Sequence, residues 1–290
     1  ALTPPLHGFD RFIGIWLYTG PPAFIVDVGP AATSAFLLRA LRDLAIDHLD
    51  YLLLTHIHID HAGGIGDVAA AFPRAQIVAH ARSLPHLVQP ERLWQHSLKA
   101  LGPTAEAYGP IRAVTPDRLV DALRLDDPQI HIIPTPGHAP HHISYAVGDL
   151  LFAGEAGGVC LATSRPKLYM RPATPPRFYL DAALESLDRL IDLQPRTIAY
   201  SHFGLFSDAQ SLLVSHRRQL LLWKDIIGQT LSDAGPNAGI HDYLQPLLTS
   251  DTRLNAFSTM TDQEKLREQG FLDNSIRGFV GYLQETPERG

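Results

Sequence analysis

Short apolar runs alternate with amphipathic stretches along the first eighty residues. Apolar runs bounded by turn-forming residues predict strands at 12–18, 23–28, 50–54 and 75–79. Apolar positions at helical spacing predict helices over 33–44 and about 66–72. An opening hairpin followed by alternating strands and helices predicts a layered α/β arrangement.

The pattern changes after residue 82. Helices are predicted at 92–108 (interrupted at Gly102-Pro103), 179–193, 209–232 and 274–284. Strands are predicted at 129–133, 143–147, 150–153 and 197–200, and a proline-rich loop at 165–177. We therefore divide the chain into a domain at 1–205, with an insertion at about 82–128, and a mainly helical extension at 206–290. That extension could cap an active site or mediate self-association as a homodimer.

Composition narrows the class of protein. The 290 residues are 45% hydrophobic and 19% charged, which fits a protein with a substantial core. No apolar run approaches the roughly twenty residues that span a bilayer, so we expect no membrane partner. The formal net charge is −6 with no long basic run, which argues against a nucleic-acid groove.

Two features bear on the compartment. The single cysteine, Cys160, excludes an intramolecular disulfide and fits a reducing environment, where it is expected to be a small buried residue. The first residues, 1–5, show no basic region followed by an apolar core, as a signal peptide would. We expect a cytoplasmic protein, although a trimmed start would leave secretion open.

A cluster of potential metal ligands, Thr55-His56-Ile57-His58-Ile59-Asp60-His61, follows the buried strand at 50–54. His56 and His58 are two positions apart, so in extended backbone both side chains project to one side and can converge on one ion. Asp60 and His61 come after the strand, where a turn allowed by the glycines at 63, 64 and 66 can bring them to a neighbouring point. Imidazole and carboxylate together suit zinc, iron or manganese.

This run resembles the H-x-H-x-D-H signature of the metallo-β-lactamase superfamily, and three later segments resemble further motifs of that family in the same order. These segments are Thr135-Pro136-Gly137-His138, Asp149-Leu150-Leu151-Phe152-Ala153-Gly154-Glu155 and Ile198-Ala199-Tyr200-Ser201-His202. The resemblance implies an α+β fold, a four-layer αββα sandwich, with the helical extension added. In the family, insertions such as 82–128 commonly shape the substrate cleft.

The resemblance also implies a site with two divalent metal ions, zinc being favoured and iron or manganese remaining alternatives. One ion would be held by His56, His58 and His138, and the other by Asp60, His61 and His202. Glu155 stands where the family usually has Asp; it would bridge both ions or, alternatively, support the site without ligating. Asp27 and His142 match family positions that support and orient the ligands.

The chemistry implied is hydrolysis of a small-molecule substrate. Two divalent ions can share a hydroxide near neutral pH, and Asp60 would orient that hydroxide and carry a proton. The branch most similar is the glyoxalase-II-like and lactonase-like one, which acts on thioesters, esters or lactones. The segment Phe203-Gly204-Leu205-Phe206 lacks the usual glyoxalase II continuation. Four basic residues after Glu155 offer a place for an anionic group or a solvated loop: Arg165, Lys167, Arg171 and Arg177.

Two other functions remain open at this stage. The same scaffold hosts iron-dependent oxidoreductases and dioxygenases, and a carboxylate-rich ligand set suits iron as well as zinc. A non-catalytic binding protein could also have kept the fold. Iron content with a visible absorption band would favour the first, and two bound metals without turnover would favour the second.

Overall fold

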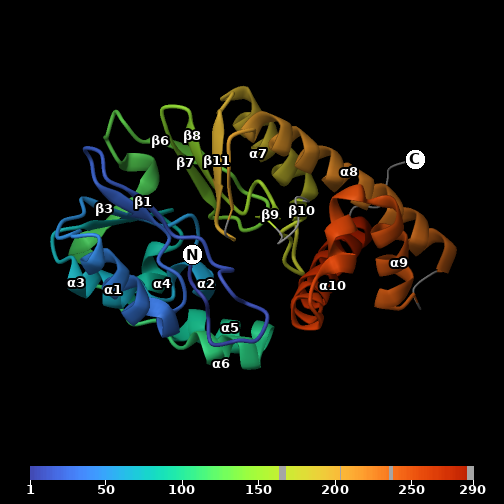
Figure 1. Ribbon diagram of the computed structural model, residues 1–290, viewed down its shortest axis with the longest axis horizontal. Coiled ribbons are helices and arrows are strands. Elements are labelled where there is room, and N and C mark those ends of the chain that lie inside the picture. The colour runs from blue at the N-terminus through green and yellow to red at the C-terminus, as the bar shows by residue number, and fades with distance from the viewer. Residues whose placement is uncertain (163–167, 203, 235–237, 286–290) are drawn as a thin grey trace.

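The computed structural model describes residues 1–162, 168–202, 204–234 and 238–285 (Figure 1). The strands are β1 (Trp16–Tyr18), β2 (Phe24–Val26), β3 (Tyr51–Leu53), β4 (Gln76–Ala79), β5 (Leu119–Asp121), β6 (His131–Pro134), β7 (Ile143–Val147), β8 (Leu150–Gly154), β9 (Val159–Ala162), β10 (Leu168–Arg171), β11 (Thr197–Tyr200) and β12 (Gly204–Phe206). The helices are α1 (Ser34–Asp43), α2 (Ile59–Ala62), α3 (Ile65–Ala71), α4 (Leu84–Val88), α5 (Glu91–Leu101), α6 (Pro103–Tyr108), α7 (Leu180–Asp192), α8 (Ala209–Ala234), α9 (Ile240–Ser250) and α10 (Asp262–Glu285). Short 3₁₀ helices lie at Ala31–Thr33, Pro116–Arg118, Ala122–Arg124 and Thr252–Thr259.

Within the described residues the strands form two five-stranded sheets and a small ribbon. The first sheet has the order β1-β2-β3-β4-β5, in which only the β1–β2 pair is antiparallel. The second has the order β12-β11-β8-β7-β6, in which only β8 and β11 run parallel. The antiparallel ribbon β9–β10 lies between the second sheet and the last helices, α8 and α10 (Figure 1).

Alternation along each strand separates the layers. Phe24 and Leu53 point between the sheets and pack in one cluster with Tyr145 of the second sheet. Their neighbours Ile25 and Leu52 point the other way, into a cluster shared with α1 and α3. A period of two therefore buries both faces of the first sheet. The resulting four-layer αββα sandwich confirms the predicted fold.

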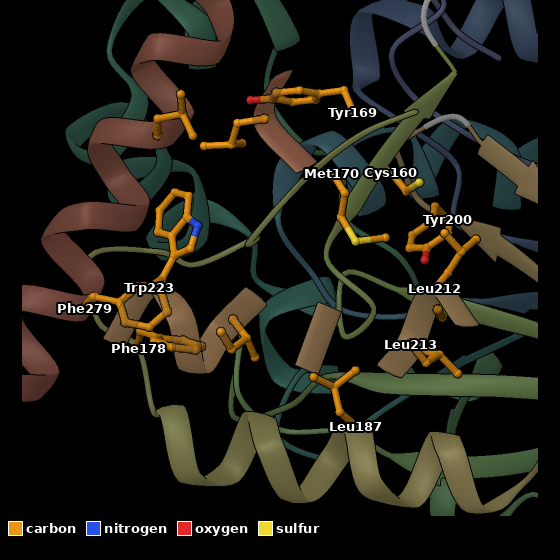
Figure 2. Packing of buried hydrophobic residues seen from close by; sticks show 14 of the residues in the cluster. Cys160, Tyr169, Met170, Phe178, Leu187, Tyr200, Leu212, Leu213, Trp223 and Phe279 are labelled. Carbon is orange, nitrogen blue, oxygen red and sulfur yellow. The ribbon is translucent and has the colours of Figure 1, made fainter. Parts of the chain in front are cut away.

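The helical extension packs on the outer face of the second sheet. Trp223 of α8 lies 5.8 Å from Phe279 of α10 between ring centroids, and Phe279 lies 5.1 Å from Phe178 before α7 (Figure 2). The indole nitrogen of Trp223 donates a 2.8 Å hydrogen bond to Asp251, so this buried polar atom is satisfied. One cluster of buried side chains joins the second sheet, α7, α8 and α10 (Figure 2).

Several predicted elements differ from the observed ones. The expected loop at 165–177 contains β10, whose Tyr169 and Met170 are buried, while Arg165 and Lys167 lie outside the described residues. The helix predicted at 274–284 is the second half of α10, which begins at Asp262. The segment at 82–128 carries not only helices but also β5, which completes the first sheet beside β4.

The glycines after the histidine cluster have another role than the one predicted. Gly63 and Gly64 have negative φ values of −55° and −81°, so no left-handed turn requires them. A Cβ on Gly63 would lie 2.8 Å from the backbone nitrogen of Ala31, and one on Gly64 would lie 2.7 Å from the hydroxyl of Ser34. Close packing of α2 and α3 against the segment before α1 is therefore what excludes larger residues here.

Candidate metal centre

The histidine cluster lies at the carboxyl end of β3. The chain leaves the sheet after Leu53, bends at Thr55 and enters α2 at Ile59, directly after His58, whose backbone is extended. Nε2 of His56 and Nδ1 of His58 approach to 3.0 Å, as expected of side chains two positions apart on one side. Asp60 and His61 lie on the short helix α2 instead of an open turn.

His138 and Glu155 close a first group of ligand atoms around this pair. Nδ1 of His138 donates to the carbonyl of Ala173 at 2.7 Å, which leaves the Nε2 lone pair facing the cluster. That Nε2 lies 2.9 Å from Nδ1 of His58 and 2.8 Å from Oε2 of Glu155. Ligand atoms of His56, His58, His138 and Glu155 all lie within 4.8 Å of one another.

Asp60, His61 and His202 form a second group of the same kind. Nε2 of His61 lies 3.4 Å from Oδ2 of Asp60, and it is buried without a hydrogen-bond partner. Nε2 of His202 lies 3.0 Å from Oε1 of Glu155, whose other oxygen faces the first group. Oε2 also lies 3.6 Å from Nε2 of His61, so the Glu155 carboxylate stands between the two groups and contacts both, as a bridging carboxylate would.

The donor set fits divalent metal ions. Imidazole nitrogens and two carboxylates converge here, and within the described residues Nε2 of His61 is buried without a hydrogen-bond partner. A buried ring nitrogen such as Nε2 of His61 is costly without a partner, and a cation would supply one. Zinc, iron and manganese all accept this mixture of nitrogen and oxygen ligands.

Burial and neighbouring charge set the protonation of the ligands. Burial lowers the pKa of His58 to about 3 and holds that of His56 well below its usual range, so both imidazoles are neutral. Burial alone would raise the pKa of the two carboxyls, but His61 beside Asp60 and His138 beside Glu155 outweigh it and hold both values low. The same contacts raise the pKa of His61 and of His138, so a bound cation would displace protons from these two rings. Neutral imidazoles and ionised carboxylates are the metal-binding forms of these groups.

Asp27 ties the histidine loop to its surroundings. It is buried directly after β2 with a φ of +56°, a conformation that costs energy for a residue other than glycine. Its carboxylate accepts hydrogen bonds from the backbone nitrogen of Thr55 at 2.8 Å and from Ser201 Oγ at 2.9 Å. It also lies 3.2 Å from Nδ1 of His61, so it orients this ring toward the cluster. The sequence motifs contain Thr55 and Ser201, but no role in the site was predicted for either residue.

His142 and His141 do not join the ligand groups. Nδ1 of His142 lies 2.8 Å from the hydroxyl of Thr135, and its Nε2 accepts from the backbone nitrogen of Glu155 at 3.0 Å. Both ring nitrogens are thus used to hold the segment that carries Glu155. His141 is half-buried and lies 3.4 Å from the backbone nitrogen of Ile57 through its Nε2.

The helical extension covers one side of the centre. The ring of Phe12 lies 4.4 Å from that of His202, and Phe271 of α10 stacks on Phe12 at 5.6 Å. Phe271 itself lies 6.2 Å from His202. These contacts support capping of the candidate metal centre, which is one of the two roles expected for the extension. No sequence pattern linked Phe271 to His202, because 69 positions of chain separate them.

Arg171 is not the exposed basic residue that the sequence suggested. It is buried, and its Nε donates to Oε2 of Glu268 at 2.5 Å. Nε of Arg267 donates to the other oxygen of Glu268 at 2.8 Å, while each guanidinium lies over an aromatic ring. Arg171 is therefore committed to holding α10 against β10. Arg177 is exposed beside Tyr179, at 5.9 Å from its ring.

Comparison with known families agrees with this geometry. The sequence profile of the metallo-beta-lactamase superfamily matches residues 14–202, which include every member of both ligand groups. The chain belongs to this superfamily. No helix among the described residues is long and apolar enough to cross a membrane.

Individual relatives share about 30% sequence identity with this chain. The chain is 30% identical over 203 residues to the metallo-beta-lactamase fold-containing protein ST1585 of Sulfurisphaera tokodaii, covering 67% of this chain and 74% of that protein. It is 31% identical over 201 residues to a hydroxyacylglutathione hydrolase of Cupriavidus taiwanensis, covering 68% and 64%. A second protein of that name, from Stenotrophomonas maltophilia, is 29% identical and is covered over 46% of its length.

Solved structures extend the likeness of the fold beyond residue 202. The crystal structure of ST1585, described from Sulfolobus tokodaii, aligns over 97% of this chain and 98% of its own with a TM-score of 0.67 at 22% identity. The protein TTHA1429 of Thermus thermophilus aligns over 94% and 88% with a TM-score of 0.61 at 19% identity. The helical extension is thus part of a fold seen in other members of the superfamily.

Proposed function

We propose that this chain is a metal-dependent hydrolase that cleaves a small acyl compound, a thioester in the first place and an ester or lactone as alternatives. The observation that carries the proposal is the Glu155 carboxylate, which lies between the two groups of candidate ligands and contacts both. Two divalent ions, zinc being favoured, would be held by His56, His58 and His138 and by Asp60, His61 and His202. Ions held there supply Lewis acidity and activate water near neutral pH.

The side chains of the site have distinct tasks in this proposal. Asp60 is the more accessible of the two carboxylates, with 16% of its side chain exposed against 8% for Glu155. Its low pKa keeps it ionised, so its Oδ atoms can accept a hydrogen bond from an attacking water and orient it. Phe12 and Phe271 keep water away from the His202 side.

The choice of a thioester rests on the relatives. Two proteins named hydroxyacylglutathione hydrolase are 29% and 31% identical to this chain, which covers 46% and 64% of their length. Their name supports an acyl–sulfur bond as the substrate bond. The acidic net charge of −6 disfavours a polyanionic substrate such as nucleic acid.

The test combines elemental analysis of the protein as isolated with a panel of substrates. Thioester, ester, lactone and phosphodiester substrates should be compared at equal metal content. Two zinc ions per chain with hydrolysis of acyl substrates is the expected result. Iron with oxygen consumption, or two bound metals with no turnover on any substrate, would contradict the proposal.

A further inference from the structure

One candidate metal ligand is oriented by a segment that lies outside the ligand motifs. Nδ1 of His138 lies 2.7 Å from the carbonyl oxygen of Ala173, and a carbonyl oxygen can only accept. The neutral ring therefore carries its proton on Nδ1 and presents Nε2 to the first ligand group, which comprises His56, His58, His138 and Glu155. Ala173 is only 7% exposed and lies between β10 and α7. The direction of the His138 ring thus depends on the position of the Ala173 carbonyl.

The segment around Ala173 is stiff and poor in hydrogen-bond donors. It reads Pro172-Ala173-Thr174-Pro175-Pro176, and three of these five residues are proline. Proline fixes φ, removes the backbone N–H and restricts the residue before it. Carbonyl oxygens are therefore the main points at which neighbouring elements can hold the segment. A displacement at one point of so stiff a segment moves the neighbouring carbonyls with it.

The last helix, α10, holds the beginning of this segment. Oγ of Ser275, which is 1% exposed, donates to the carbonyl of Pro172 at 3.3 Å. Nη1 of Arg171 donates to the same oxygen at 3.2 Å, and Nε of Arg171 donates to Glu268 of α10. The peptide group before Ala173 is thus bonded to α10 directly through Ser275 and indirectly through Glu268.

Close packing against α10 holds the end of the segment. A Cβ added at Gly278 would collide with the carbonyl oxygen of Pro175 and lie 3.2 Å from Cβ of Phe178. A Cβ added at Gly281 would lie 3.6 Å from the carbonyl oxygen of Pro176, an ordinary contact. Glycine at 278 is therefore what allows the backbone of α10 to approach the segment so closely.

Two other ligand rings are oriented from the first sheet. Nδ1 of His61 lies 3.2 Å from Asp27, which follows β2. Nδ1 of His56 lies 3.0 Å from the hydroxyl of Thr55, which follows β3. His138 differs from these two rings because its partner belongs to a segment that is bonded to α10.

We propose that α10 positions His138 through the 172–176 segment, so that the affinity of the first ligand group for its ion depends on how α10 is seated. Ser275 and Gly278 are positioning residues that act through the Ala173 carbonyl. The helical extension is then a part of the metal centre, although it supplies no candidate ligand among the described residues. The inference rests on the ligand groups of the proposed function and does not require hydrolysis.

Three glycine-to-alanine substitutions along α10 test this role. Gly278→Ala places a methyl group against the carbonyl of Pro175, whereas Gly281→Ala makes an ordinary contact and Gly270→Ala meets nothing within 4 Å. All three replace a helical glycine by alanine, so the intrinsic helix preference changes alike. Competition with a chromophoric chelator measures Zn²⁺ affinity. We expect Gly278→Ala to weaken one of two bound ions by about tenfold or more, and the other two variants to stay within about twofold.

Ser275→Ala tests the same role without added bulk. It removes only the hydroxyl that holds Pro172, and we expect Zn²⁺ affinity to fall by about threefold. Ser258→Ala, which removes an exposed hydroxyl bonded to the carbonyl of Asn255, is the matched control and should change nothing. Because Ser275→Ala introduces no clash, it decides the question if Gly278→Ala does not fold.

The imidazole ¹H–¹⁵N signals of the Zn²⁺-loaded protein report the bond to Ala173 itself. In the wild type we expect the Nδ1–H of His138 to be protected from exchange with water. Exchange should be faster in Gly278→Ala and Ser275→Ala, while the Nδ1–H of His61, bonded to Asp27, stays as it is. A general loss of structure would instead change both rings.

The outcomes separate this inference from the proposed function. Unchanged Zn²⁺ affinity in Ser275→Ala and Gly278→Ala overturns the positioning role, whatever the activity. An equal loss in Gly270→Ala, or a loss with the Nδ1–H signal of His138 unchanged, overturns it as well. If affinity follows the expected pattern but no acyl substrate is cleaved, the proposed function fails and the positioning role stands.

Discussion

The backbone nitrogen of Glu155 donates a 3.0 Å hydrogen bond to Nε2 of His142. Because Nδ1 of the same ring contacts Thr135, the imidazole connects the segment before β7 to the residue that follows β8. Gly154, the last residue of β8, directly precedes Glu155 and has a φ of +61°. A Cβ at this position would collide with the His142 ring. The direction of the Glu155 side chain is therefore determined by groups that are not ligands themselves.

Glu155 should be required for metal binding. Glu155→Gln removes the charge that faces both ligand groups, so we expect lower metal content by elemental analysis and an affinity weakened by about tenfold or more. Glu155→Asp keeps the charge on a shorter side chain and should retain more metal than the Gln variant. Glu185→Gln, exposed on α7, serves as the control. Full stoichiometry and activity in both Glu155 variants would show that this carboxylate is not a ligand.

Asp60 should matter more for turnover than for folding. Asp60→Asn removes the ionised carboxylate from the second group, and we expect kcat/KM on the best acyl substrate to fall by about 10²–10⁴-fold. The matched control is Asp67→Asn on α3, which alters an exposed carboxylate 3.6 Å from Arg112. Circular dichroism should show both variants folded. Activity within a few-fold of the wild type would remove Asp60 from the catalytic role.

Glu268 should be important for stability. Glu268→Gln leaves the buried guanidinium groups of Arg171 and Arg267 without their carboxylate. Breaking a buried pair in this way costs about 3–5 kcal/mol of unfolding free energy. Asp188→Asn, which breaks the exposed pair with Arg217, should cost less than about 1 kcal/mol. Urea denaturation of the three proteins makes the comparison, and equal losses in both variants would argue against it.

Stability should depend on pH through His216. Its pKa is about 4 in the folded chain against 6.5 ordinarily, so between these values the unfolded chain binds the additional proton. This contribution to stability is complete above about pH 6.5 and is lost as the pH falls toward 4, by up to about 3 kcal/mol. Relative to His216→Leu, the wild type should lose more unfolding free energy over this range. Parallel losses in the two proteins would mean that His216 is not buried as a neutral ring.

The sequence predicted those parts of the centre that depend on local backbone. His56 and His58 converge because they are two positions apart in extended chain, and this needs no knowledge of the remaining fold. His138, Glu155 and His202 were predicted from the order of the motifs alone. In the structure His138 contacts His58, and Glu155 contacts both His138 and His202.

Contacts made by the helical extension could not be predicted in this way. Phe271 approaches His202, and Glu268 pairs with Arg171, only because α10 lies against β10 and the first residues of the chain. Helical periodicity does not identify such partners. In the sequence, His216 is one polar position on a predicted helix, and its burial could not be predicted from that pattern. The short strand β10 was missed because the prolines around it outweighed four residues of strand-forming sequence.

The stacking of Phe12, His202 and Phe271 has a consequence for how this protein could be divided or recombined. Residues from the beginning of the chain, from the end of the family-matched segment and from the last helix meet at one imidazole. A fragment ending near residue 205 would contain every candidate ligand of the centre and yet expose one face of it to solvent. Grafting the ligand motifs alone onto another scaffold would transfer the donors without the aromatic enclosure that surrounds them here.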